Sequence, residues 1–303
     1  TEEYFGVPSW ICGVVLAIAV GSVIIGGIKR IGTVAATLVP FMCALYLLAG
    51  IWVLSGHVAE IPAMLLLIVK SAFVPTEASG AFVGGTAGAA FVFGMKRAIF
   101  SNEAGQGSSP IAHAAAKTDE PVREGIVAGL EPFIDTIVVC TFTALIILST
   151  GIWNRAPDEP LPVMPAIEAT DAGWQFEDSR VDGDDWRDGE RVVLVVAAHV
   201  RDGGFDQYRL EGTVASGAGG YIVRWDAFAS DVQPRVVGDG LYRSYVGAAL
   251  TAKAFDTVTP GLGKWLITIA AWMFAISTII SWAYYGEQGV VFLAGEKPVL
   301  AYK

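Results

Sequence analysis

The stretch from Val34 to Leu54, VAATLVPFMCALYLLAGIWVL, decides the fold, because it is uncharged and long enough to cross a hydrocarbon core of about 30 Å as a helix. The stretch before it, Trp10 to Gly26, is also uncharged. The linker GIKRIG between them carries Lys29 and Arg30, which the positive-inside rule assigns to the cytoplasm. The first helix is therefore predicted to run from outside to inside.

The third apolar region is interrupted. Residues Ile61 to Phe73 are apolar, but the next stretch, VPTEASGAFVGGTAG (74–88), is rich in proline, glycine and small polar residues. Backbone groups freed in lipid are costly, so such a break is tolerated only where it is buried in protein or lines a wet cavity. A broken helix near 61–100, of the kind that marks a transporter's binding site, is therefore predicted. Two short interfacial helices joined by a loop explain this stretch alone equally well.

The remaining spans follow from the basic residues. The segment FSNEAGQGSSPIAHAAAKTDEPVR (100–123) has Lys and Arg at both ends and is assigned to the cytoplasm. A helix from about Val122 to Thr150 follows it, and the last span is Trp265 to Tyr285. Alternation then puts residues 154–245 outside and Lys297 inside, and Lys264 is the only charge in a short loop that departs from this scheme.

Composition divides the chain between two solvents. Hydrophobic residues make up 53% of it and charged residues only 17%, against about a quarter in soluble domains. The net charge of −10 comes mainly from residues 154–245 and argues against a nucleic-acid partner. In that block, RVVLVVAAHV (191–200) and YIVRWDAFA (221–229) predict strands between turn clusters, and His199 is taken as structural.

The predicted organisation has three parts. Residues 1–153 are transmembrane helices, 154–245 form an acidic, β-rich soluble insert outside the membrane, and 246–303 hold a transmembrane helix and its flanks. The chain begins without an initiator Met or a signal-peptide pattern, so we expect it to be part of a longer protein.

Several motifs in order resemble the alanine or glycine:cation symporter family. They are FSNEAGQGSSPIAHAAAKTDEPV (100–122), FIDTIVVCTFTALIIL (133–148), GAALTAKAF (247–255), FAISTIISWAYYGE (274–287) and GGIKRIGTVAATLVPFMCALY (26–46). The resemblance implies a partial leucine-transporter-like inverted-repeat fold in an all-α polytopic membrane protein, covering core helices four to eight. The broken region would be core helix six and the last span core helix eight. The family's Gly-Thr-Gly-Asn-rich first helix has no counterpart in the chain, and the acidic insert lies outside the minimal family pattern.

The break is the predicted substrate site. A zwitterionic amino acid needs N–H donors for its carboxylate and carbonyl oxygens for its ammonium, and a broken helix supplies both. Thr76, Ser79 and Gly80 offer such groups, and Phe82 could form an apolar wall that admits only a small side chain. On the last span, the resemblance adds Trp282 to this pocket.

Sodium prefers oxygen ligands, so hydroxyls in an apolar helix are candidates. Ser277 and Thr278 are adjacent, and Trp282 lies one turn beyond Thr278 on the same face. The resemblance implies a sodium site at Thr278, with Ser277 beside it. The alternative is that both hydroxyls bond back to the preceding helical turn.

Ionisable residues in apolar spans are functional hypotheses. Asp135 could bond the SNEAG segment or Thr136, while Lys70 and Glu77 could pair or Glu77 could admit protons. Asn102, Glu103 and the nearby Arg97 are predicted to latch an inner gate, with an ordinary solvated loop as the alternative. His113 is expected to be structural.

These observations predict a secondary transporter and not an enzyme. It would carry alanine or glycine with sodium as coupling ion, need no cofactor, contact membrane lipid and work in the inner or plasma membrane. The alternatives are a proton-coupled amino-acid carrier and a membrane-anchored sensor that works through its acidic external domain, whose partner the sequence does not identify.

Overall fold

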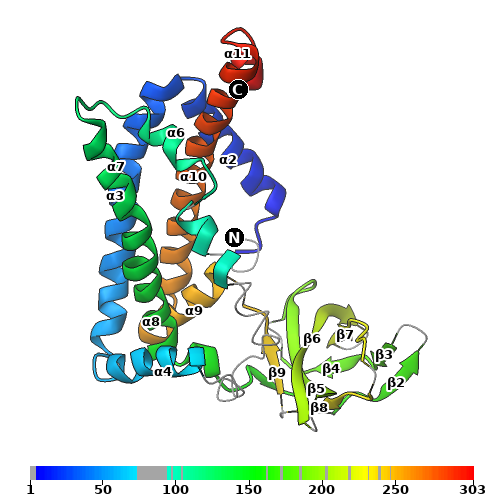
Figure 1. The fold of residues 1–303 in the computed structure, drawn as a ribbon. Helices are drawn as coiled ribbons and strands as arrows, with labels where there is room; N and C mark the ends of the chain where they lie inside the picture. Colours follow the sequence, from blue (N-terminus) through cyan, green and yellow to red (C-terminus); the bar gives the residue numbers. More distant parts are fainter. Residues whose placement is uncertain are drawn as a thin grey trace. The chain divides into compact units, whose positions relative to one another are not determined.

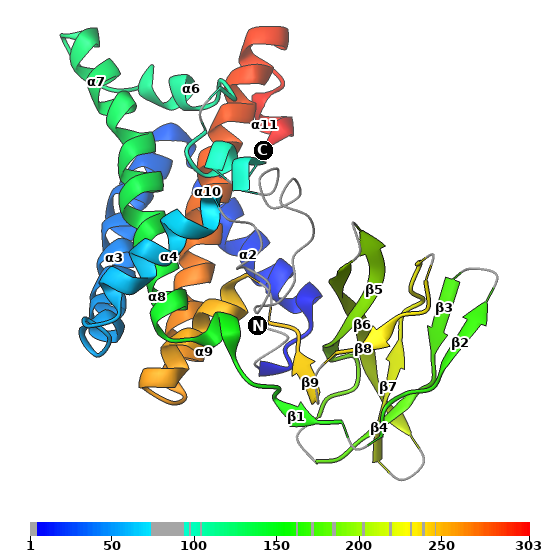
Figure 2. The same cartoon turned by 60° about the horizontal axis from the view of Figure 1, so that its bottom comes forward.

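The computed structural model describes residues 5–73, 94–96, 98–103, 105–161, 163–170, 173–183, 186–201, 204–217, 220–230, 232–237, 240–245 and 247–303. The chain divides into two compact units (Figures 1 and 2). One holds residues 1–64, 94–150 and 247–303, and the other holds residues 65–93 and 151–246.

The first unit is helical. In the described part of the chain, three continuous helical stretches have the length and composition to cross a membrane. They are α3 (Gly27–Ser55), the run of α7 (Pro121–Pro132), η2 (Phe133–Cys140) and α8 (Thr141–Ser149), and α10 (Leu262–Ala294). The shorter helices are α2 (Ser9–Ile24), α6 (Ser109–His113), α9 (Ala248–Val258) and α11 (Val299–Tyr302). Helix α4 (Ile61–Phe73) begins in this unit, and its residues from 65 onward belong to the second.

Two predicted boundaries were wrong. The GIKRIG segment is not a linker, because α3 begins at Gly27 and takes Lys29 and Arg30 into its first turn. The last span is longer at both ends than Trp265 to Tyr285, since α10 runs from Leu262 to Ala294. In both places the backbone hydrogen bonds of the helix continue through charged or glycine-containing flanks, which hydropathy alone marks as ends.

The spans of this unit pack through small residues and a few polar bonds. Helices α3, α8 and α10 run side by side in both views, and α9 packs against α10 (Figures 1 and 2). Gly50 of α3 lies so close to Phe142 and Ile146 of α8 that a β-carbon there would overlap them. Tyr46 Oη lies 2.8 Å from Thr143 Oγ1 across the same contact. Small residues of this kind allow close approach of helices that lipid does not drive together.

Pro132 marks a change of helix type. It lacks an N–H group and so cannot donate to the preceding turn, and the eight residues after it form the π-helix η2. π-helical turns are rare and occur frequently at functional sites. This π-helix carries Asp135 and Thr136.

The second unit is built from strands: β1 (Glu159–Pro160), β2 (Ile167–Thr170), β3 (Gly173–Phe176), β4 (Ser179–Val181), β5 (Arg191–Arg201), β6 (Gly204–Gly217), β7 (Gly220–Trp225), β8 (Arg235–Val236) and β9 (Gly240–Arg243). Seven of them form an antiparallel sheet in the order β1-β9-β5-β6-β7-β4, with β8 paired to β5, while β2 and β3 form a separate pair. The strands predicted at 191–200 and 221–229 correspond to β5 and β7.

The core of this unit explains its register. Leu194 of β5 pairs with Leu210 of β6, and both are fully buried. Val192 and Val196 lie on the same face of β5 as Leu194 and join Trp225 of β7 in one apolar cluster. A shift of one residue would move this set out of the core, so burial fixes the pairing.

Candidate functional site

The two hydroxyls predicted to bind sodium point in different directions. Ser277 is buried, and its Oγ donates to the carbonyl oxygen of Phe274 at 2.9 Å. Thr278 is exposed, because consecutive residues of an α-helix point about 100° apart. Ser277 therefore shows the back-bonding that was its alternative role, while Thr278 lies on an exposed face of α10.

Trp282 lies on the same exposed face of α10 as Thr278. Its side chain is 41% exposed, and its ring stacks on Phe100 with centroids 6.4 Å apart and an interplanar angle of 21°. The ring of Tyr285 packs edge-on against the Trp282 ring, with centroids 5.8 Å apart. The aromatic side chain predicted to line the substrate pocket is thus in contact with the start of the SNEAG segment.

The other predicted substrate residues lie outside the described residues. They are Thr76, Ser79, Gly80 and Phe82, and the same holds for Glu77 and for Arg97 of the predicted gate. Lys70, near the end of α4, is exposed.

The SNEAG segment is bonded to the π-helix. Ser101 Oγ donates to Asp135 Oδ2 at 2.7 Å, which is the first of the two bonds predicted for Asp135. Asn102 Nδ2 donates to Thr136 Oγ1 at 3.1 Å. Two consecutive residues of the segment are therefore joined to two consecutive residues of η2.

Beyond these bonds the segment turns sharply. Glu103 has a positive φ of 53°, which is uncommon for a residue other than glycine. Its carboxylate accepts a hydrogen bond from Ser108 Oγ at 2.7 Å, which closes the turn. Gly105 and Gly107 have φ values of 77° and 83°, a region that glycine enters without steric cost.

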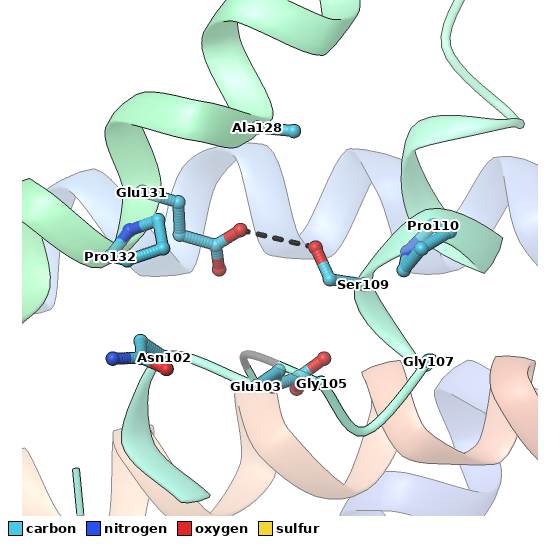
Figure 3. Close-up of a pocket in the computed structure, with 9 residues that line it drawn as sticks. All are labelled: Asn102, Glu103, Gly105, Gly107, Ser109, Pro110, Ala128, Glu131 and Pro132. Atoms are coloured by element: carbon cyan, nitrogen blue, oxygen red, sulfur yellow. Dashed lines mark hydrogen bonds between the residues drawn. The ribbon is translucent and has the colours of Figure 1, made fainter. Parts of the chain in front are cut away.

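The turn, α6 and α7 line an open cavity of about 350 Å³ (Figure 3). The carboxylate of Glu131, on α7, points towards Ser109 at the start of α6, and Ser109 Oγ donates to Glu131 Oε2 at 3.3 Å. The wall consists of residues from the turn, from α6 and from α7: Asn102, Glu103, Gly105, Gly107, Ser109, Pro110, Ala128, Glu131 and Pro132. Its volume suits a small ligand.

The sequence did not predict the partners of His113, which lies behind this wall. His113 Nδ1 lies 2.7 Å from Glu124 Oε1, and His113 Nε2 lies 3.5 Å from Glu131 Oε2. The hydrogen bond with Glu124 is the main cause that raises the pKa of His113 above its usual value. The available signal was the spacing of Glu124 and Glu131, seven residues apart on one face of a helix.

A second, mostly apolar cavity of about 290 Å³ lies among α3, α9 and α10. Trp52 and Thr259 form its polar contact, with Trp52 Nε1 donating to Thr259 Oγ1 at 3.2 Å. Its lining offers few polar groups to fix the orientation of a zwitterion.

Several helices of membrane-crossing length are typical of polytopic membrane proteins. Comparison with known proteins agrees: a model of the family described as the sodium:alanine symporter family matches residues 1–172 and 235–303. The chain belongs to this family. The residues between the matched ranges include β5, β6 and β7, so most of the sheet lies outside the shared pattern.

Curated relatives agree on transport. The sodium/alanine symporter AgcS of Methanococcus maripaludis is 32% identical over 99% of this chain and 46% of its own length. The putative sodium/proton-dependent alanine carrier YrbD of Bacillus subtilis is 30% identical over 97% of this chain and 44% of its own. The probable sodium/glutamine symporter GlnT of the same organism is 41% identical over 50% of this chain and 31% of its own.

The chain spans less than half the length of these relatives. No solved structure gives a significant match. The family to which the chain belongs is thus one of membrane symporters and not of enzymes.

Proposed function

We propose that the protein carries small neutral amino acids, alanine or glycine, across the cell membrane in symport with sodium. The observation that carries the proposal is the family match, which covers the spans and the SNEAG segment. The name of the Methanococcus relative supports both the ion and the substrate. A leucine-transporter-like arrangement, with α10 as core helix eight, is part of the same proposal.

In this proposal the substrate binds at the break that the sequence predicts near residues 61–100. Thr76, Ser79 and Gly80 supply backbone and hydroxyl groups, and Phe82 and Trp282 limit the size of the side chain. One methylene is worth only about 1–3 kcal/mol in such a pocket, so the discrimination is steric.

Sodium binds through Thr278, on the same face of α10 as Trp282. The exposure of Thr278 in this chain supports this role, because its hydroxyl is open to a partner helix. Ser277 contributes less, since its hydroxyl is already bonded. One sodium ion crossing about 100 mV gains about 2.3 kcal/mol, and a tenfold gradient adds about 1.4 kcal/mol, enough for accumulation of several hundred fold.

The SNEAG segment forms the cytoplasmic gate. Its bonds to Asp135 and Thr136 couple its position to the π-helix of the spanning segment. Asn102 and Glu103 line the cavity behind this gate, and Arg97 stands next to it in sequence. Alternating access would move this loop with α7 and η2.

Proton coupling is the second candidate. The Bacillus relative's name, sodium/proton-dependent alanine carrier, favours it, and Glu77 would be its proton site. The name of a third relative extends the substrates to glutamine. A sensor that works through the acidic unit remains the alternative of a different class.

We expect the full-length protein in proteoliposomes to accumulate alanine when sodium is high outside. Under a proton gradient of equal size without sodium, uptake should stay near the level of empty vesicles. Accumulation driven by protons alone would replace sodium with the proton as the coupling ion. Absence of uptake for alanine, glycine and glutamine under either gradient would overturn the transport proposal.

The acidic unit is proposed to lie outside the membrane. Ser216, exposed near the end of β6, offers a labelling site, and Ser216→Cys should react with a membrane-impermeant thiol reagent in intact cells. A cysteine at Ala115, in the cytoplasmic segment, is the matched control and should react only after lysis. The reverse pattern would invert the topology.

A further inference from the structure

The imidazole of His113 lies between two carboxylates on the same face of α7. Nδ1 lies 2.7 Å from Glu124 and Nε2 lies 3.5 Å from Glu131. A neutral imidazole has one donor nitrogen and one acceptor nitrogen, whereas the imidazolium ion has two donors. Since an ionised carboxylate only accepts, both bonds require a protonated ring.

We propose that His113 is a positioning residue, which holds the Glu131 carboxylate on the wall of the 350 Å³ cavity while its ring is protonated and releases it when the ring loses its proton. Through this bridge the pH of the cytoplasm acts on the gate. The inference rests on the proposed function, which makes the cavity part of the transport pathway.

The geometry decides which carboxylate is released. The contact with Glu124 is short, and the contact with Glu131 is at the limit of a hydrogen bond. A neutral ring keeps its single donor on Glu124 and turns a lone pair towards Glu131. Among the described residues, the hydrogen bond that Glu131 then keeps is the one from Ser109 Oγ, at 3.3 Å. Glu131 is also the one of the two carboxylates that lines the cavity (Figure 3).

The bridge joins α6 to α7, and so it also fixes the turn that precedes α6. The ring of His113 is about three-quarters buried, while the side chain of Glu131 is 44% exposed and free to swing away once its partner is lost. From α10, which also packs on α6, Tyr285 interacts electrostatically with Glu103 and Glu131 and adds no positive charge. The charges that act on the ring within the described residues are thus the two carboxylates.

The direction of the pH effect follows from the sign of the shift. The hydrogen bond with Glu124 raises the pKa of His113 above its usual value, and Glu131 adds to this, whereas burial acts in the opposite sense. The stabilisation that the bridge contributes is therefore fully present below about pH 6.5, and it is lost as the pH rises through the raised pKa of His113. Transport should fall on the alkaline side of neutrality.

The first test measures how accessible the cavity wall is to a thiol reagent, and it does not depend on transport. In the full-length protein with Cys12, Cys43 and Cys140 replaced by serine, Ala128→Cys places a thiol on the cavity wall. Its alkylation rate is measured from about pH 6.5 to about pH 8.5 with the native His113 and with His113→Lys. Lysine keeps its charge to about pH 10 and has three donors, so it preserves the bridge over this range.

At each pH the His113 rate is divided by the His113→Lys rate, which removes the titration of the thiol. We expect this ratio to change by roughly twofold to fivefold across the range, the effect of losing one long ion pair to a half-exposed carboxylate. His57→Gln is the control, because His57 bonds a backbone carbonyl, that of Val53, and should leave the step unchanged. A ratio that stays constant would overturn the inference.

The second test follows sodium-driven alanine uptake against cytoplasmic pH. In the native protein, uptake should fall as the cytoplasmic pH rises through the pKa of His113. This fall should be absent in His113→Lys. It should also be absent in Glu131→Gln, which removes the carboxylate that is released. Glu124→Gln should keep a step but move it to lower pH, because the main stabiliser of the protonated ring is gone. A native pH profile in His113→Lys would count against the bridge.

The two proposals fail separately. A His113-dependent alkylation step without any sodium-driven uptake would leave the bridge intact and overturn the proposed function. Sodium-driven uptake with an alkylation step that ignores His113 would overturn only the bridge.

Discussion

Replacing Thr278 by alanine is expected to raise the sodium concentration for half-maximal alanine uptake by roughly tenfold or more. The hydroxyl lies on an exposed face in the middle of α10, and loss of a ligand leaves a cation under-coordinated in a low dielectric. A penalty of about 1–3 kcal/mol for such a loss corresponds to this change. Uptake by the full-length protein, measured against sodium at saturating alanine, gives the value.

Ser277→Ala is the matched control on the neighbouring residue. Its hydroxyl is buried and bonded to the carbonyl oxygen of Phe274, so its removal should lower stability slightly and leave sodium dependence nearly unchanged. Trp282→Ala should change which amino acids compete for uptake, because it removes a wall and not a ligand. If Thr278→Ala and Ser277→Ala gave the same sodium dependence, the assignment of sodium to Thr278 would fail.

Replacing Gly263 by leucine is expected to separate α9 from α10. A β-carbon at this position would overlap the backbone carbonyl of Ala252 and come within 2.8 Å of the backbone nitrogen of Asp256. Backbone atoms in a helix cannot move aside singly, so the helices must part. They would then lose the bond from the Gly263 N–H to Asp256 Oδ1, now 2.7 Å long, which satisfies a free donor at the start of α10.

Overpacking of this kind costs about 3 kcal/mol or more, which lowers a melting temperature by roughly 6 °C or more. The measurement is the melting temperature of the detergent-solubilised full-length protein, followed by the loss of its monodisperse peak. Gly289→Leu, on the same helix, is the control, since a β-carbon there meets no atom of the described residues within 4 Å. Equal melting temperatures for the two variants would show that the α9–α10 contact does not limit stability.

The spans could be predicted because burial in a membrane constrains the residue type at each position of a helix separately. A helix in hydrocarbon must be apolar along its length and satisfy its own backbone bonds, so α3 and α10 are visible as uncharged runs. The strands β5 and β7 could be predicted in the same way, from apolar runs bounded by glycine and aspartate. The ends of the helices were harder to predict, because a helix ends where its backbone hydrogen bonds end and not where hydropathy falls. Helix α3, which includes Lys29, is an example.

The candidate site was predicted only where one element sufficed. Thr278 and Trp282 share a face because they are four residues apart on one helix, and the sequence determined that. The sequence could not separate Ser277 from Thr278 by burial, because that depends on where Met42 of α3 meets α10.

By itself, then, the sequence determined the apolar spans, the acidic strand-rich block and the family motifs, all of which are local patterns. Only the tertiary structure decided that Ser101 and Asn102 bond to consecutive residues of the π-helix, and that His113 bridges Glu124 and Glu131 behind a cavity. These contacts join separate elements, and the geometry that brings them within hydrogen-bond distance is set by packing. A short-range sequence pattern does not encode contacts between separate elements, so the sequence alone predicted only a structural role for His113.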